Sequence, residues 1–160
     1  TRDWGLKVSK FSYKIRVQVE DFDESEENRN LILNRSGALV NFIGTVRGNY
    51  TTSENILSLT LEHYPQMTEN EIFKIVKKAN QRWSVESITV IHRVGKLFPN
   101  DKIVYIGVSS QHRQSAFDAC NYIIDWLKTN APFWKSEEFK NKKLWVDERK
   151  EDNLALKKWN

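Results

Sequence analysis

Alternating apolar and polar residues define the first predicted strand, and related patterns return along the chain. Residues 11–19, FSYKIRVQV, place an apolar side chain at every second position, which is the period of a half-buried strand. Segments rich in β-branched and aromatic residues predict further strands. These strands are expected over residues 38–46, 56–64, 87–97, 102–110 and 143–149. Gly44 should interrupt its strand, and the turn FPND, residues 98–101, should join its two flanking strands as a hairpin.

Apolar residues at helical spacing predict two long helices. Residues 67–83 carry an apolar stripe along one face, and Thr68 with Glu71 has the spacing of a capping box. The stripe consists of Ile72, Ile75, Val76, Ala79 and Trp83. The second helix should begin within residues 110–115 and end before Pro132, because proline disfavours helix at the residue before it. Its inward face is expected to hold Phe117, Cys120, Ile124 and Leu127.

Two shorter helices and a polar loop complete the predicted order. The acidic segment that follows residue 20 favours a short helix that stops at Ser36-Gly37. Its candidate N-caps are Asp21, Asp23 and Ser25. Residues 151–159 predict a terminal helix, and residues 48–55, GNYTTSEN, predict an exposed, mobile loop because they are polar and lack periodicity.

Two long helices among hairpin-like strands predict the α+β class with a mainly antiparallel sheet. The 160 residues fit one domain of ordinary size, so residues 1–160 are expected to form a single domain. The sequence lacks a membrane-spanning run and, at its N-terminus, the apolar core of a secretory signal. Because the one cysteine, Cys120, also fits a reducing compartment and reads as a core residue, we expect a cytoplasmic protein.

The charge of the chain is mildly positive and narrows its function only a little. The net charge is +4 and the sequence pI is about 9.1, which suits an anionic ligand, a nucleic acid or an acidic protein surface. One cysteine and three scattered histidines give no ligand spacing of a known metal site. We therefore expect no metal.

Two lysines flank a rigid aromatic turn, APFW, at residues 131–134. At 100° per residue, Lys128 lies about 40° from Ile124 and so at the edge of the inward face. It is either a last-turn lysine that complements the helix dipole and extends its amine to water, or a partly desolvated general base or nucleophile. Lys135 follows the turn, and the two amines can share a pocket only if the chain doubles back there.

Arginine and histidine side chains offer further candidates for anion binding. His92 and Arg93 are neighbours in a predicted strand, so they should point to opposite faces, and we interpret this pair as structural. His112 and Arg113 open the second long helix, where free backbone N–H groups suit a phosphate or carboxylate, although a capping role fits equally well. Arg47 follows a strand end, where it could clamp an anion or simply face solvent.

Six segments in order make the chain resemble a known family. They are FIGTVRG, LTLEHYPQM, VIHRVG, SSQHRQSAFDA, LKTNAPFWKSE and WVDER, spread from about Ser36 to Arg149. Together they resemble the large catalytic subunit of molybdopterin synthase. The resemblance implies an α/β hammerhead-type fold and a homodimer of this chain within a heterotetramer that holds two copies of a small ubiquitin-like sulfur-carrier subunit. That subunit's C-terminal thiocarboxylate would donate sulfur to cyclic pyranopterin monophosphate and so form the dithiolene of molybdopterin, with no cofactor.

The resemblance also implies roles for particular residues. Lys128 and Lys135 correspond to the family's catalytic lysines. The positions that correspond to its substrate pocket are Arg47, His112, Arg113, Phe42 and Arg149, the last being contributed across the dimer by the neighbouring subunit. Two lysines, two or three arginines that bind the phosphate or the tail, and a helix N-terminus would supply the cationic surroundings that two anionic reactants need.

Two other classes of function remain open from sequence. An RNA-binding module would use the basic balance with the six tryptophans and five tyrosines for phosphate contacts and stacking, yet most aromatic residues fall at core-period positions. A scaffold that only binds a ubiquitin-like partner would need neither lysine for chemistry. No membrane partner is expected.

Overall fold

The computed structural model describes residues 11–33, 35–48, 55–140, 142–145 and 150–159, and these form two four-stranded sheets and four helices. The first sheet has the order β1-β4-β6-β2, with β1 (Ser12–Gln18), β4 (Ser87–Arg93), β6 (Lys102–Ser110) and β2 (Ala38–Thr45). β1 and β4 are parallel, whereas the other pairs are antiparallel. The second sheet has the order β5-β3-β7-β8 and is antiparallel, with β5 (Gly95–Leu97), β3 (Ser58–His63), β7 (Phe133–Phe139) and β8 (Lys142–Trp145). The predicted α+β class and mainly antiparallel pairing are confirmed.

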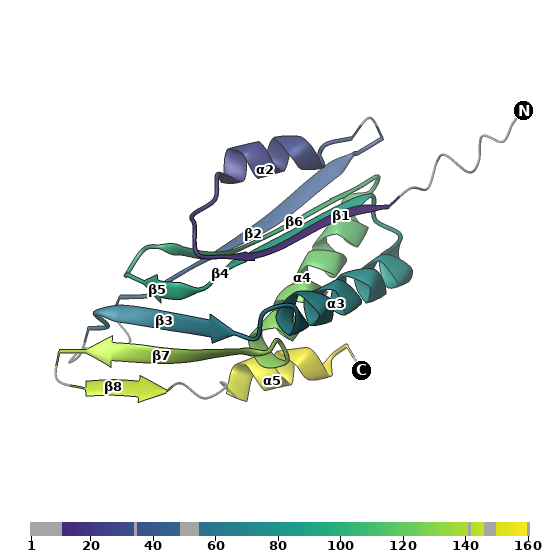
Figure 1. The fold of residues 1–160 in the computed structure, drawn as a ribbon. Coiled ribbons are helices and arrows are strands. Elements are labelled where there is room, and N and C mark those ends of the chain that lie inside the picture. Colours follow the sequence, from purple (N-terminus) through teal and green to yellow (C-terminus); the bar gives the residue numbers. More distant parts are fainter. Residues whose placement is uncertain (1–10, 34, 49–54, 141, 146–149, 160) are drawn as a thin grey trace, which may run out of the picture.

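Helices cover both faces of the first sheet (Figure 1). The two long ones, α3 (Met67–Trp83) and α4 (Arg113–Thr129), pack on one face, and α2 (Glu24–Leu31) lies on the other. α5 (Lys150–Lys157) packs against α4. The main core lies between the sheet and the long helices, and its fully buried side chains include Ile72, Val76, Ile88, Val90 and Ile123. This sandwich holds α4, and with it Lys128, in a fixed position.

The sequence patterns predicted most elements but missed one strand. Asp23 is the N-cap of α2, whose helix ends at Leu31 rather than at Ser36. The register of β2 shifts between Gly44 and Thr45, as the predicted interruption requires. β7 was assigned no element from sequence, although it carries Lys135. The predicted loop at residues 48–55 lies mostly outside the described residues.

Two predictions about the long helices were wrong. The predicted pair Thr68 and Glu71 does not cap α3, because the helix begins at Met67, and it is Glu69 whose carboxylate accepts the backbone N–H of Gln66 at 2.9 Å. Phe117 is 56% exposed rather than buried. The small side chains Ala116 and Ala119 face inward in its place, and such residues let a helix backbone approach its neighbours closely.

The predicted hairpin forms, but its first strand divides between the two sheets. β4 pairs with β6 up to His92, as expected. At Gly95 the backbone takes a φ of +90°, which glycine adopts without strain. Residues 95–97 therefore leave the first sheet and pair with β3 in the second. This crossing carries the chain from one sheet to the other beside His92.

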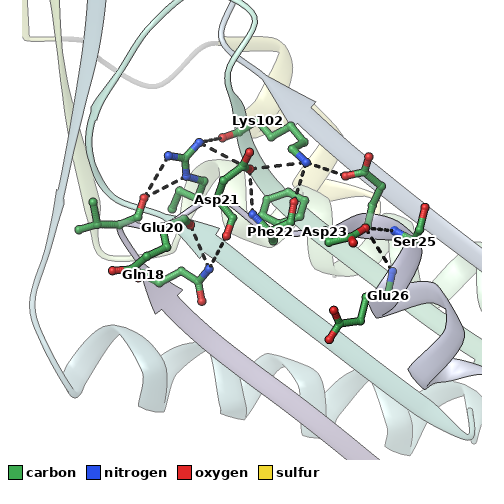
Figure 2. Close-up of polar contacts among 11 residues, drawn as sticks. Gln18, Glu20, Asp21, Phe22, Asp23, Ser25, Glu26 and Lys102 are labelled. Atoms are coloured by element: carbon green, nitrogen blue, oxygen red, sulfur yellow. Dashed lines mark hydrogen bonds and ion pairs between the residues drawn. The ribbon is translucent and has the colours of Figure 1, made fainter.

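A polar cluster fixes the end of β4 from the side of α2 (Figure 2). The guanidinium of Arg93 donates to the backbone carbonyls of Val19 and Lys102 at 3.0–3.1 Å and lies 3.8 Å from the Asp21 carboxylate. Lys102 donates to the Glu24 carboxylate at 2.7 Å, which lowers the pKa of Glu24 and raises that of Lys102. The cluster holds Arg93 on the side of α2. Because neighbouring residues in a strand point to opposite faces, the side chain of His92 points toward the long helices.

The two sheets meet where His92 of β4 contacts Phe133 of β7. Their rings stack with centroids 3.9 Å apart and an interplanar angle of 18°. The same turn is held from α3, because the buried hydroxyl of Thr68 donates to the carbonyl of Pro132 at 3.2 Å and accepts the Tyr64 N–H at 3.2 Å. These contacts fix the path between α4 and β7.

Thr68→Val should destabilise the protein by about 1–3 kcal/mol, because it leaves two backbone groups without their buried partner. Thr68→Ser keeps the hydroxyl and should lose less, about 1 kcal/mol for the methyl group. The free energy of unfolding, measured by urea denaturation, checks both variants. A valine variant as stable as the wild type would show that the Pro132 contact contributes nothing.

Stability should also fall as the pH drops from about 6.5 to about 4. Burial lowers the pKa of His92 from 6.5 to about 4, so the unfolded chain binds a proton in this window that the folded chain does not. The loss is at most about 1.4 kcal/mol per pH unit and ends below the folded pKa. We would compare urea denaturation of wild type and His92→Phe at pH 5 and pH 7. The variant should lose less stability at pH 5; equal losses in both proteins would contradict this origin.

Candidate active site

A cavity of about 240 Å³ lies between the two sheets at the C-terminal end of α4. Most of the residues that line it are apolar, and the lining comes from β2, β3, β4, β6, α4 and β7. Three of the predicted site residues line it together, namely Phe42, Lys128 and Lys135. The remaining polar side chain of note is His92, which the sequence analysis interpreted as structural. The cavity therefore combines apolar walls with two amines and an imidazole.

The two lysines reach this cavity because the chain reverses direction after α4. α4 ends at Thr129, whose hydroxyl donates to the carbonyl of Asp125 at 2.9 Å, and β7 begins at Phe133. Lys128 thus lies in the last helical turn and Lys135 in the following strand. Both side chains are exposed, so they lie on the open side of the cavity rather than in its interior. The chain therefore doubles back after α4, which is the condition under which the two amines can share a pocket.

Lys135 is directed by the pairing of β7 with β3. In the antiparallel register Lys135 lies opposite Leu61, and Phe133 lies opposite His63. Residues two apart in a strand share a face, so Phe133 and Lys135 point the same way, as Leu61 and His63 do. The cavity wall on this side is consequently one face of the second sheet.

His92 is the functional candidate that sequence reasoning missed. It is 8% exposed, and its Nδ1 lies 2.9 Å from the carbonyl oxygen of Arg93. Burial is the main cause of its lowered pKa, and the charges of Lys135 and His63 lower it further. Its position in the sequence could have identified it: His92 follows Val90 by two residues and Ile88 by four, so it lies on the same, core-facing side of the strand. Arg93 points to the opposite face, as predicted.

Arg47 lies just beyond the cavity on the chain. Gly44 and Thr45, at the end of β2, line the cavity. Val46 follows and is buried, with its N–H donating to the carbonyl of Asp101 at 2.9 Å. Arg47 is the next residue and is exposed. Arg47 therefore lies two residues after Thr45, the last cavity-lining residue of β2.

His112 and Arg113 lie at the opposite end of α4 from the lysines. His112 is the N-cap and Arg113 the first helical residue, and both are exposed. Fifteen residues separate Arg113 from Lys128, which corresponds to about 22 Å along the helix axis. His112 lines a different cavity, beside Arg35 and Glu86. A single chain therefore does not bring this pair to the lysines, and Arg149 lies outside the described residues.

Other groups offer no competing chemistry in the described part of the chain. Cys120 is 3% exposed and burial raises its pKa to about 12, as expected for a core thiol. Among the described residues, no three His, Cys, Asp or Glu side chains gather as a metal site would require. The helices that the structure describes are all too short or too polar to cross a membrane.

Proteins similar over nearly the whole chain carry one name. The molybdopterin synthase catalytic subunit of Yersinia pestis is 46% identical over 147 residues, which cover 91% of this chain and 97% of that protein. The molybdopterin synthase catalytic subunit of Escherichia coli (strain K12) shows the same identity and coverage. These relatives match in length as well as in sequence.

Solved structures and a family model agree with these relatives. The molybdopterin biosynthesis MoaE protein from Burkholderia ambifaria superposes with a TM-score of 0.79 at 41% identity, covering 92% of this chain and 97% of that one. A complex of subunits 1 and 2 of molybdopterin-converting factor from Helicobacter pylori matches with a TM-score of 0.66 at 25% identity, covering 86% and 91%. The family model described as MoaE protein matches residues 17–130. The chain therefore belongs to the MoaE family, whose relatives matched here are molybdopterin synthase catalytic subunits.

Proposed function

We propose that this chain is the catalytic subunit of a molybdopterin synthase and acts as a sulfurtransferase. Sulfur would pass from the C-terminal thiocarboxylate of a small ubiquitin-like subunit to cyclic pyranopterin monophosphate, and two transfers would form the dithiolene. The observation that carries this proposal is the cavity at the end of α4, which Lys128 and Lys135 line from different elements together with Phe42. The similarity to catalytic subunits over more than nine-tenths of the chain supports it.

Charge explains why such a reaction uses lysines. A thiocarboxylate and a cyclic phosphate are both anions, and they repel each other unless cations lie between them. Lys128 and Lys135 provide two positive charges beside apolar walls, and their attraction for an anion strengthens when a reactant covers the opening and reduces the access of water. The exposed positions of both amines leave them open to reactants that enter from solvent.

The C-terminal tail of a small subunit fits the volume of the cavity. A volume of about 240 Å³ is below the usual range for pockets that enclose whole drug-sized ligands. It suits the end of an extended chain without side chains, such as a Gly-Gly tail. The complex of two subunits described for the Helicobacter pylori relative supports a partner of this kind.

The two lysines take different parts in the proposed mechanism. The thiocarboxylate sulfur forms a C–S bond with a substrate carbon as a C–O bond of that carbon breaks, and Lys128 serves there as the acid/base group or a transient nucleophile. Water then hydrolyses the resulting thioester, which leaves the sulfur on the substrate and returns the tail as a carboxylate. Lys135 stabilises the negative charge that develops on oxygen. Phe42 lines the cavity, and Arg47, close to its rim along the chain, binds the phosphate or the tail.

A homodimer would complete the site. His112 and Arg113 lie about 22 Å along α4 from Lys128 in their own chain, which is too far for both ends of the helix to hold one small substrate. In a two-fold dimer, the N-terminal end of α4 from one subunit can approach the lysines of the other. We therefore assign His112, Arg113 and Arg149 to the phosphate site across the dimer, within a heterotetramer with two small subunits.

The chain is proposed to act as a single domain in the cytoplasm. Both sheets and α4 contribute to the same cavity, which supports one functional unit. The one cysteine is a buried free thiol, which suits a reducing compartment.

Replacing Lys128 by alanine should lower the single-turnover rate by about 100-fold or more, because the acid/base group is lost. The assay mixes the chain with a thiocarboxylated small subunit and cyclic pyranopterin monophosphate and follows molybdopterin formation. Lys135→Ala should also slow the reaction, whereas Lys74→Ala, which changes a lysine 69% exposed on α3, should behave as wild type. A folded Lys128→Ala complex with the wild-type rate would refute the assigned role. A wild-type complex that forms but makes no product would favour the binding scaffold.

Mixing two inactive variants tests the shared site. Lys128→Ala and Arg113→Ala should each be inactive alone. Half of the dimers formed after subunit exchange are mixed, and each mixed dimer keeps one intact site, so activity should recover to about a quarter of the wild-type value. If Arg113 acts within its own chain, the mixture stays inactive although exchange is detected by mass spectrometry.

A further inference from the structure

We propose that His92 is a positioning residue that holds the Lys135 side chain in the cavity, with its neutral imidazole accepting a hydrogen bond from the lysine ammonium through Nε2. The two strands bring both residues to one cavity, where the charge of Lys135 acts on the His92 ring. Its meaning for catalysis rests on the proposed function.

The tautomer of His92 is fixed by its own strand. Nδ1 lies 2.9 Å from the carbonyl oxygen of Arg93. A carbonyl oxygen only accepts, so Nδ1 carries the proton and donates it to this bond. Nε2 is then the nitrogen with the lone pair, and it is an acceptor. The stacking of the ring on Phe133 at 3.9 Å restricts its rotation and so fixes the direction of that lone pair.

Lys135 lies within reach of this ring. It follows Phe133 by two residues on the same face of β7, and such positions are about 7 Å apart along a strand. A lysine side chain has four methylene groups and spans a similar distance. His92 and Lys135 both line the cavity, and the charge of Lys135 acts on the His92 ring. The amine can therefore bend back toward the imidazole that stacks on its neighbour.

Burial keeps His92 neutral, and the surrounding charges add to this effect. Lys135 from β7, His63 from β3 and Lys128 from α4 are the titratable groups near its side of the cavity. Burial of the ring already disfavours a second proton, and a positive charge there would repel the ammonium of Lys135. A group of such low basicity is a poor proton acceptor at neutral pH, which separates its role from acid/base catalysis.

A fixed acceptor would help Lys135 in two ways. A hydrogen bond to the charged form favours the ammonium, which is the form that stabilises a developing oxyanion. It also selects one rotamer of a flexible side chain before substrate binds, and so reduces the entropy lost when the reactive geometry forms. Without the acceptor, Lys135 would remain in the cavity but lose its direction.

The test compares wild type with His92→Phe, His92→Met and His92→Gln. Phenylalanine keeps the stacking without an acceptor, methionine has a similar length without a strong acceptor, and glutamine supplies an amide oxygen. The apparent pKa of each lysine is measured by labelling with acetic anhydride at a series of pH values, followed by mass spectrometry of the peptides. Thermal melting reports whether each variant is folded.

Loss of the acceptor should lower the apparent pKa of Lys135 by about half a pH unit or more in the folded Phe and Met variants. Glutamine should restore it at least in part, and Lys74 on the exposed face of α3 should be unchanged in every protein. The single-turnover rate should fall about tenfold in the Phe and Met variants and recover with Gln.

An unchanged pKa of Lys135 in a folded acceptor-free variant would overturn the proposal. A glutamine variant that matches methionine in both the pKa of Lys135 and the rate would overturn it as well, because size alone would then explain the effect. The labelling needs no substrate. A wild-type complex that makes no product would thus refute the proposed function while the Lys135 labelling still decides whether His92 holds the amine.

Discussion

The stacking of His92 on Phe133 is the contact on which the candidate site depends. It joins β4 of the first sheet to β7 of the second. Around it, Thr68 holds Pro132 from α3, and the division of the strand at Gly95 carries the chain between the sheets. Because the sheets meet at this end of α4, the turn after the helix folds back and directs Lys128 and Lys135 to one cavity.

Charge is distributed unevenly around that cavity, in a way that suits two anionic reactants. The amines lie on the exposed side, where water can reach them, and the buried imidazole is neutral. Placing the positive charges at the opening avoids the cost of burying them without partners. The apolar walls then strengthen each interaction when a reactant covers the opening. This arrangement attracts anionic reactants without burying a positive charge that lacks a partner.

Local patterns predicted the type of most elements, and their failures have identifiable causes. The alternation in residues 11–19 and the stripe in residues 67–83 correspond to β1 and α3 because burial on one face imposes the period of the element. β7 was missed because FWKSEEF is polar over much of its length. Phe117 was placed inside because a large aromatic residue was preferred to the small alanines that allow close packing.

The sequence by itself determined the class of fold, the family and the alternation that separates His92 from Arg93, because these depend on residue type and spacing along the chain. Tertiary structure alone decided which face of β4 borders the cavity and how Lys128 meets Lys135. The physical reason is that a cavity is formed by contacts between elements distant in sequence, and no local period encodes those contacts.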